Sequence, residues 1–218
     1  MATDRIVIAI DTPGYGDSDG TPELPTIADY ARSAAAALEA LGYGAGGPVD
    51  VLGYHTGCLI AAELAAQRPD LVRRLALPGV PFLTGAEQRE AYEKYAKPSP
   101  VEADGAHLKT QWAFSTFAMD AGVSLARAQE HFNDLMQCYP ACWRAYHAVF
   151  TYDGAARFPE VSQPVLLISF TGSLDAETKA ARAYFPNAEH VRFDDIAKGA
   201  FDVAPERVAV VVRDFLDE

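Results

Sequence analysis

The sequence has few cysteines, an odd number of them, and no cluster of metal-binding side chains. Its 218 residues include three cysteines, Cys58, Cys138 and Cys142. An odd count does not fit a framework of paired disulfides, and a spacing of four between Cys138 and Cys142 is not the CxxC spacing of a zinc site or redox motif. No clustered histidines complete a zinc site around them. We therefore expect free core cysteines and no bound metal.

Positive charge and long apolar runs are also scarce. Lysine and arginine number 18 against 30 aspartates and glutamates, a formal net charge of -12. This charge repels phosphate backbones and anionic lipids, so neither nucleic acid nor a membrane is expected as a partner. No apolar run approaches the length of about 18 residues that spans a bilayer. The N-terminus also lacks the apolar region of a signal peptide, which predicts a cytoplasmic protein.

What the sequence does contain is a series of short aliphatic and β-branched runs, which predict buried strands. The runs lie at 5–10, 49–54, 73–78, 164–169 and 189–193. Alanine-rich helical stretches follow several of them, at 26–41, 57–68, 175–184 and 205–216. Strands that alternate with helices predict an α/β fold with a doubly wound, mainly parallel sheet.

Residues 79–163 break this alternation with helical patterns at 84–97, 106–119, 124–137 and 139–150. We predict a helical cap at 79–163, inserted into a core formed by 1–78 and 164–218. Large rings in the cap are expected to form one wall of an apolar substrate pocket, with His147 as a polar contact. Those rings are Trp112, Trp143, Tyr146 and Phe150. The alternative, that these side chains only pack the helices together, stays open.

Several motifs occur in a fixed order. "DTPGYGDSDG" (11–20) follows the first run, and "GYHTG" (53–57) follows the second and leads into a helix. "SFTGSLD" (169–175) follows the fourth run, and "APERV" (204–208) opens the last helix. The ordered set resembles the α/β-hydrolase fold family over nearly the whole chain. In that family the "GYHTG" position is the nucleophile elbow, a tight strand-to-helix turn that projects a nucleophilic side chain into the pocket.

The resemblance also shows where this chain departs from the family. The elbow position, usually serine, is His55. The acid position is Asp175, whereas the position of the family's catalytic histidine falls on Lys198, and residues 191–218 contain no histidine. The family's first three strands and the oxyanion loop after them have no counterpart, because residue 5 already begins what resembles the fourth strand. The chain thus resembles an N-terminally incomplete member of the family.

This departure leaves two arrangements of the sheet open. The runs at 5–10 and 49–54 pair directly, or a gap between them exposes unpaired strand edges. In the second case, we expect association into a homo-oligomer through the exposed edge.

The resemblance implies chemical roles for the residues at the elbow and the acid turn. His55, oriented by Asp175, would act as a general base, and the backbone N–H of Thr56 would stabilise an oxyanion. Lys198 either binds Asp175 and removes it from His55, or is a solvated loop residue. Thr12 and Tyr15 are most simply part of a structural turn.

We therefore expect an atypical hydrolase-like or lyase-like enzyme that acts on a small apolar ester or carbonyl compound and needs no cofactor. A catalytically silent protein that binds a small molecule is the alternative, as is an incomplete chain. In the silent protein His55 would merely fill space in an inactive site, whereas the activity of an incomplete chain would need absent N-terminal residues.

Overall fold

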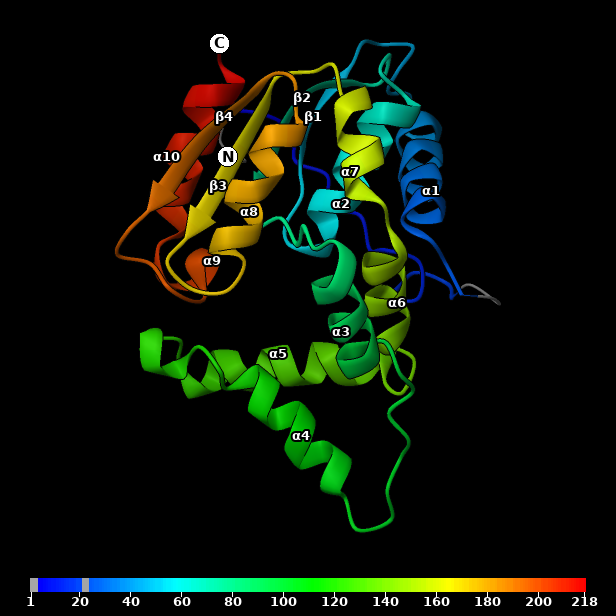
Figure 1. The fold of residues 1–218 in the computed structure, drawn as a ribbon, viewed down its shortest axis with the longest axis vertical. Coiled ribbons are helices and arrows are strands. Elements are labelled where there is room, and N and C mark those ends of the chain that lie inside the picture. Colours follow the sequence, from blue (N-terminus) through cyan, green and yellow to red (C-terminus); the bar gives the residue numbers. More distant parts are fainter. Residues whose placement is uncertain (1–3, 21–23) are drawn as a thin grey trace.

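A computed structural model describes residues 4–20 and 24–218 and shows a parallel sheet between layers of helices (Figure 1). The strands are β1 (Val49–Leu52), β2 (Val72–Pro78), β3 (Val165–Phe170) and β4 (Ala188–Phe193). They form one sheet in the order β1-β2-β3-β4, and each neighbouring pair is parallel. The predicted α/β fold and the four strands from 49 onward are confirmed.

Both faces of the sheet are buried. On one face Leu75, Leu77 and Leu167 pack with α1 (Ile27–Ala40), α2 (Thr56–Gln67) and α8 (Asp175–Ala181). On the other face Leu166 and Ile168 pack with α10 (Pro205–Leu216). Because successive side chains of a strand point to opposite faces, a strand buried on both sides must be apolar throughout. This explains the continuous apolar runs at 75–78 of β2 and 165–168 of β3.

The predicted strand at residues 5–10 is wrong. The segment is not part of the sheet, and its apolar side chains are exposed, with Ile6 81% and Val7 57% accessible to solvent. β1 ends the sheet and pairs only with β2, so the direct pairing of residues 5–10 with β1 does not form. Strand-forming residues adopt a strand only where a neighbour completes the hydrogen-bond ladder, and no neighbour reaches this segment among the described residues.

The N-terminal segment that contains this run, residues 5–15, is instead held near its two ends. Near the start, the Arg5 guanidinium lies 2.7 Å from the carboxylate of Asp217, beyond the end of α10. Further along, the Tyr15 hydroxyl donates a 2.9 Å hydrogen bond to the backbone carbonyl of Cys142. The segment thus connects the end of α10 with the helices beyond β2.

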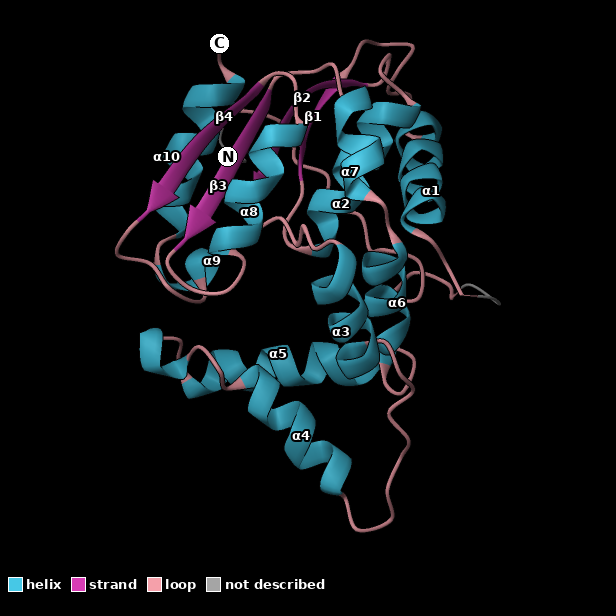
Figure 2. Cartoon of the chain, viewed as in Figure 1, coloured by secondary structure: helices cyan, strands magenta, loops and turns pink. Residues whose placement is uncertain are grey.

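Between β2 and β3 the chain forms only helices and loops, as Figure 2 shows. The strands point their carboxyl ends toward these helices, of which α3 packs against α6, and α4 against α5. No helix in the described part of the chain is long and apolar enough to cross a membrane. The helices are α3 (Gly85–Tyr95), α4 (Ala106–Ser115), α5 (Leu125–Cys138), α6 (Trp143–Thr151) and α7 (Gly154–Arg157), with short 3-10 turns at Met119–Ala121 and Phe158–Glu160.

After β3, the remaining elements are short apart from α10. A 3-10 turn at Arg182–Tyr184 extends α8 toward β4, and α9 (Ala200–Val203) precedes α10. The loop between β4 and α9 returns to the carboxyl edge of the sheet, where Thr171 donates its backbone N–H to the carbonyl of Ile196 at 2.9 Å.

Candidate active site

The turn from β1 to α2 has the close packing of a nucleophile elbow. A side chain at Gly53 would bring its Cβ to 2.2 Å from the carbonyl oxygen of Gly57, so only glycine fits there. His55 sits at the apex with φ 49° and ψ -114°. A non-glycine residue with positive φ is held in a sparsely populated conformation, and such strain concentrates at functional sites. The elbow is therefore present, with an imidazole at its apex.

The His55 ring is enclosed by its neighbours. It stacks on Tyr54 with 4.0 Å between ring centroids, and a Cβ added to Gly79 would lie 2.8 Å from the imidazole Cδ2. Burial lowers the pKa of His55 to about 4, because the enclosed ring cannot solvate a positive charge. The imidazole is therefore neutral at neutral pH.

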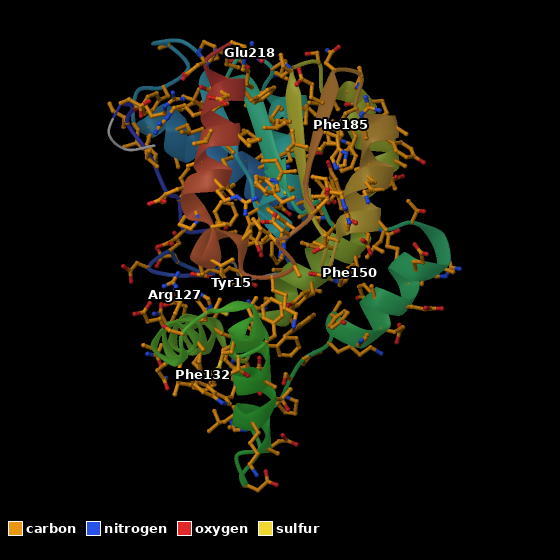
Figure 3. The ribbon with its side chains drawn as sticks, turned by 90° about the vertical axis from the view of Figure 1, so that its left-hand side faces the viewer. Tyr15, Arg127, Phe132, Phe150, Phe185 and Glu218 are labelled. Carbon is orange, nitrogen blue, oxygen red and sulfur yellow. The ribbon has the colours of Figure 1, made fainter. Side chains whose placement is uncertain are left out.

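His55 and Thr56 open on a cavity of about 520 Å³. This volume suits a small molecule, and apolar side chains predominate in the wall. Figure 3 shows Tyr15 and Phe150, two residues of the wall, at the level where the helices between β2 and β3 meet the sheet. The wall is formed by Tyr15, His55, Thr56, Pro81, Leu83, Ala91, Tyr95, Leu135, Cys142, Ala145, Tyr146, Val149, Phe150, Ser173, Leu174 and Glu177.

Thr56 is the first residue of α2. The first N–H groups of a helix have no partner within it and carry partial positive charge. Within the described residues the N–H of Thr56 donates to no backbone carbonyl, whereas the next two N–H groups of the turn donate to Tyr54 and His55. A free N–H beside His55 can accept the developing charge of an oxyanion.

Asp175 does not orient His55. Its carboxylate accepts hydrogen bonds from Arg192 at 3.0 Å and from Lys179 at 2.9 Å. The Arg192 guanidinium, with a smaller contribution from Lys179, holds the pKa of Asp175 far below its usual range. Asp175 is absent from the cavity wall, where Leu174 takes its place with φ 66°. The predicted His55–Asp175 pair is therefore wrong.

The register of the sheet explains this difference. Ser169 of β3 lies opposite Arg192 of β4, and Asp175 follows at the start of α8 on the same edge. The guanidinium thus reaches the carboxylate across the sheet. An arginine and a lysine hold the anion outside the cavity, where both ion pairs stay partly solvated.

Lys198 lies in the loop before α9. Its ammonium donates to the carbonyl of Phe117 at 3.0 Å and lies over the ring of that residue, 5.8 Å from the centroid. Lys198 thus contacts the turn after α4, and the ion pairs of Asp175 are made with other residues.

The five predicted substrate-binding residues divide into two groups. Tyr146 and Phe150 line the cavity, one turn apart on α6. Trp112 packs edge-on against Phe132 in the contact between α4 and α5. Figure 3 shows Phe132 further from the sheet than Phe150. Trp143 is not among the wall residues, and His147 instead forms a 3.0 Å hydrogen bond through Nδ1 with the Tyr92 hydroxyl of α3.

Helical periodicity explains which of the predicted residues line the cavity. It also indicates wall residues that the sequence motifs do not. Cys142, Ala145, Tyr146, Val149 and Phe150 follow a spacing of three and four residues, so one face of α6 turns toward the cavity. Trp143 and His147 fall between these positions. Tyr15 lines the same cavity, although its sequence context indicates only a structural turn, and Ser173 also reaches the wall from a turn.

No group of three or more histidine, cysteine, aspartate or glutamate side chains is positioned to hold a metal ion within the part of the chain that the structure describes. The cavity wall contains one carboxylate, Glu177, and one imidazole, His55.

Comparisons with known proteins identify the family. The sequence model of the alpha/beta hydrolase fold matches residues 3–205. A pimeloyl-[acyl-carrier protein] methyl ester esterase of Aromatoleum aromaticum is 30% identical over 189 residues, covering 75% of this chain and 72% of the esterase. An (E)-2-((N-methylformamido)methylene)succinate hydrolase of Acinetobacter baylyi is 34% identical over 71 residues, which is 33% of this chain and 26% of that hydrolase.

Solved structures share the fold at low sequence identity. A hydrolase from Pseudomonas aeruginosa superimposes with a TM-score of 0.78 at 19% identity, covering 95% of this chain and 78% of that one. The enol-lactonase from Burkholderia xenovorans gives a TM-score of 0.76 at 21% identity, covering 95% of this chain and 79% of that one. Together with the match over residues 3–205, these comparisons show that the chain belongs to the α/β hydrolase fold family.

Proposed function

We propose that the chain is a hydrolase-like enzyme acting on a small apolar ester or carbonyl compound, with His55 as general base and residues 79–163 as the cap over the site. The observation that carries the proposal is the enclosed imidazole of His55 at the strained elbow, opening on an apolar cavity of about 520 Å³. Family members such as the esterase and the enol-lactonase support the reaction class.

The proposed reaction uses two groups beside one another at the start of α2. A neutral imidazole nitrogen of His55 takes a proton from water as the water oxygen attacks the substrate carbonyl carbon. The Thr56 N–H donates to the oxygen that becomes negative. The proton then passes from the imidazolium to the leaving alkoxide, which regenerates the neutral ring. Without a carboxylate partner, His55 is a weaker base than in a His-Asp pair.

A second candidate is a silent protein that binds a small molecule in the same cavity. The observation that favours it is the engagement of Asp175 by Arg192 and Lys179, which leaves His55 without an orienting anion. In this case the cavity binds ligand and no bond is broken.

Turnover of activated esters by the parent protein, His55→Gln and Asp175→Asn distinguishes the two candidates. The enzyme proposal expects turnover that His55→Gln abolishes, with ligand-induced thermal stabilisation retained. Asp175→Asn serves as a control and should keep the turnover, because its carboxylate lies outside the cavity. Ligand binding without any turnover by the parent would overturn the enzyme proposal in favour of the silent binder.

A fluorophosphonate probe tests the absence of serine chemistry. Ser173 lines the cavity from the turn before α8. The serine hydroxyl that contacts a histidine among the described residues is that of Ser169, which lies 3.0 Å from Nε2 of His190 and is absent from the cavity wall. We expect the protein to remain unlabelled, as judged by intact-protein mass spectrometry. Stoichiometric labelling that Ser173→Ala removes would assign the nucleophile to Ser173 and contradict the proposed role of His55.

A further inference from the structure

Two thiols meet where α5 and α6 join, in a part of the site that the proposed reaction does not use. Cys138 is the last residue of α5, and Cys142 is the N-cap residue of α6. The chain between them turns tightly, since the N–H of Ala141 donates to the carbonyl of Cys138 at 2.8 Å. This turn brings the two side chains, four residues apart, into mutual contact.

The two thiols have different access. Cys138 is 8% exposed, and its thiol donates to the carbonyl of Leu135 at 3.1 Å. Cys142 is partly exposed and lines the 520 Å³ cavity. The Tyr15 hydroxyl holds the backbone carbonyl of Cys142 and thereby fixes this part of the wall. A molecule in the cavity therefore meets Cys142 before Cys138.

The surroundings of the two thiols also shift their pKa values in opposite directions. When Cys142 ionises, the Cys138 thiol can donate to it in place of the Leu135 carbonyl; this contact, with backbone N–H groups at the start of α6, lowers the pKa of Cys142. The same contact raises the pKa of Cys138, with burial adding to the effect. Since the thiolate is the reactive form of cysteine, Cys142 is the better nucleophile and Cys138 stays protonated beside it.

We propose that Cys142 is a peroxide-reactive thiol that opens on the cavity, and that Cys138 resolves its oxidised form as a disulfide. The ligand class is a small apolar hydroperoxide, because the cavity that Cys142 lines has mostly apolar walls, with Leu135, Ala145 and Tyr146 among them. The proposal is independent of the proposed hydrolytic function, since neither His55 nor Thr56 takes part.

The reaction balances with the hydroperoxide as the oxidant. The Cys142 thiolate attacks the terminal peroxide oxygen, the O–O bond breaks, and the alkoxide takes up a proton to leave as an alcohol. The sulfenic acid of Cys142 then reacts with the Cys138 thiol, so that an S–S bond forms and water leaves. Two thiols are oxidised and one peroxide is reduced.

Treating the folded protein with cumene hydroperoxide, followed by tryptic mass spectrometry, tests the proposal. Residues 128–144 form one tryptic peptide that contains both thiols, because cleavage falls after Arg127 and Arg144. We expect this peptide to lose the mass of two hydrogen atoms, about tenfold faster than in the urea-unfolded protein. Cys58 is an internal control and should stay reduced, since it is fully buried.

Two variants assign the roles of the thiols. Cys138→Ser should stop at the sulfenic acid of Cys142, which dimedone traps, and Cys142→Ser should give neither adduct nor disulfide. The proposal is overturned if the folded protein reacts no faster than the unfolded one, if Cys58 oxidises first, or if dimedone labels Cys138 in Cys142→Ser. Circular dichroism verifies that both variants are folded, so a loss of reaction reports on the thiols.

Discussion

At the scale of single residues, the fold has placed a histidine where the backbone is strained and the ring is largely buried. The φ of 49° at His55 is maintained by the close contact of Gly53 with Gly57, and burial keeps the ring neutral. A serine at this position would need a separate base to remove its proton. An imidazole needs none, so a single side chain can serve as the base.

The low pKa of His55 predicts an unusual pH dependence of turnover. The neutral imidazole is the active base, so activity is present above the pKa and is lost as the pH falls through about 4. We expect a flat profile between about pH 5 and 8, where an ordinary histidine with a pKa near 6.5 would show an inflection. Initial rates with His55→Gln as the baseline test this expectation, with circular dichroism at each pH. An inflection near pH 6.5 in a folded protein would mean that the imidazole is solvated.

Gly79 sets the space available to the His55 ring. A Cβ at this position would meet the imidazole at 2.8 Å, and the backbone has φ 70°. Gly79→Ala should destabilise the protein by about 2–4 kcal/mol and reduce turnover, because strain and displacement of the ring add together. Denaturant unfolding measures the first effect and the esterase assay the second.

Gly85→Ala is the matched control for that change. Gly85 also has positive φ, 57°, but an added Cβ meets nothing within 4 Å. This variant should carry only the backbone cost, about 1 kcal/mol, and keep its activity. Equal losses in the two variants would show that the contact with His55 contributes nothing.

At the scale of elements, a buried carboxylate joins α2 to α7. Glu63 is 4% exposed and accepts hydrogen bonds from Arg157 at 2.8 Å, Tyr152 at 2.9 Å and Gln67 at 2.8 Å. Burial acts to raise the pKa of Glu63, but the hydrogen bonds outweigh it and the net shift is downward. The ionised form therefore holds α7 against α2.

Glu63→Gln should lower the free energy of unfolding by about 2–4 kcal/mol at pH 7, because the neutral amide cannot match the guanidinium. Since the folded pKa is depressed, the contribution of Glu63 is complete above its ordinary value of 4.5 and declines as the pH falls through the folded pKa. Urea unfolding at pH 7 and pH 3 should therefore show a smaller difference between parent and variant at the lower pH. Glu160→Gln, which removes an exposed partner of the same arginine, should change stability by less than about 1 kcal/mol. A difference that stayed constant with pH would contradict the proposed role of the ionised carboxylate.

The elements show what a sequence can predict and where it cannot. The strands at β2 and β3 follow from their apolar runs, since only burial on both faces accounts for Leu75, Ala76 and Leu77 in succession. The run at 5–10 has the same composition, but a ladder requires a neighbour, and composition carries no information on whether one exists. The apolar runs of β2 and β3 predict strands correctly only because the strands that pair with them are also present.

In the candidate site, too, the local sequence predicts one feature, and another depends on contacts between distant residues. Local turn chemistry predicts the elbow, because Gly53 is required by contacts within the turn itself. The partner of Asp175 depends on the register between β3 and β4, which brings in Arg192 from 17 residues away. Register is set by packing of the whole sheet, so the position of Asp175 after β3 does not predict which side chains its carboxylate contacts.

At the scale of the whole molecule, apolar surface and an unpaired strand edge remain exposed. Ile6, Val7, Ile8 and Ile10 are 36–81% accessible, and β1 carries Leu52, which is 46% exposed. Exposed edges and contiguous apolar segments favour association between chains. The net charge of -12 opposes such association, so added salt should strengthen it.

Replacing Ile6 and Ile8 together by lysine should weaken self-association by about tenfold or more, because two apolar contacts are lost and charge is added to the segment. Light scattering after size exclusion, at low and high salt, measures the effect. Val210→Lys is the control, since Val210 is 53% exposed on α10 and lies outside the segment. A parent protein that is monodisperse, monomeric and heat-stable would rule out association through this segment.

The hydrogen bond from Tyr15 to Cys142 connects the exposed N-terminal segment with the cavity. Tyr15 belongs to the same N-terminal segment as Ile6, yet its ring forms part of the cavity wall. A second protein chain that covered Ile6 would therefore contact the same segment that supplies Tyr15 to the cavity wall. Thermodynamic linkage makes this relation reciprocal: a ligand that strengthens association must bind the associated form more tightly by the same factor. The affinity of the cavity should therefore depend on protein concentration.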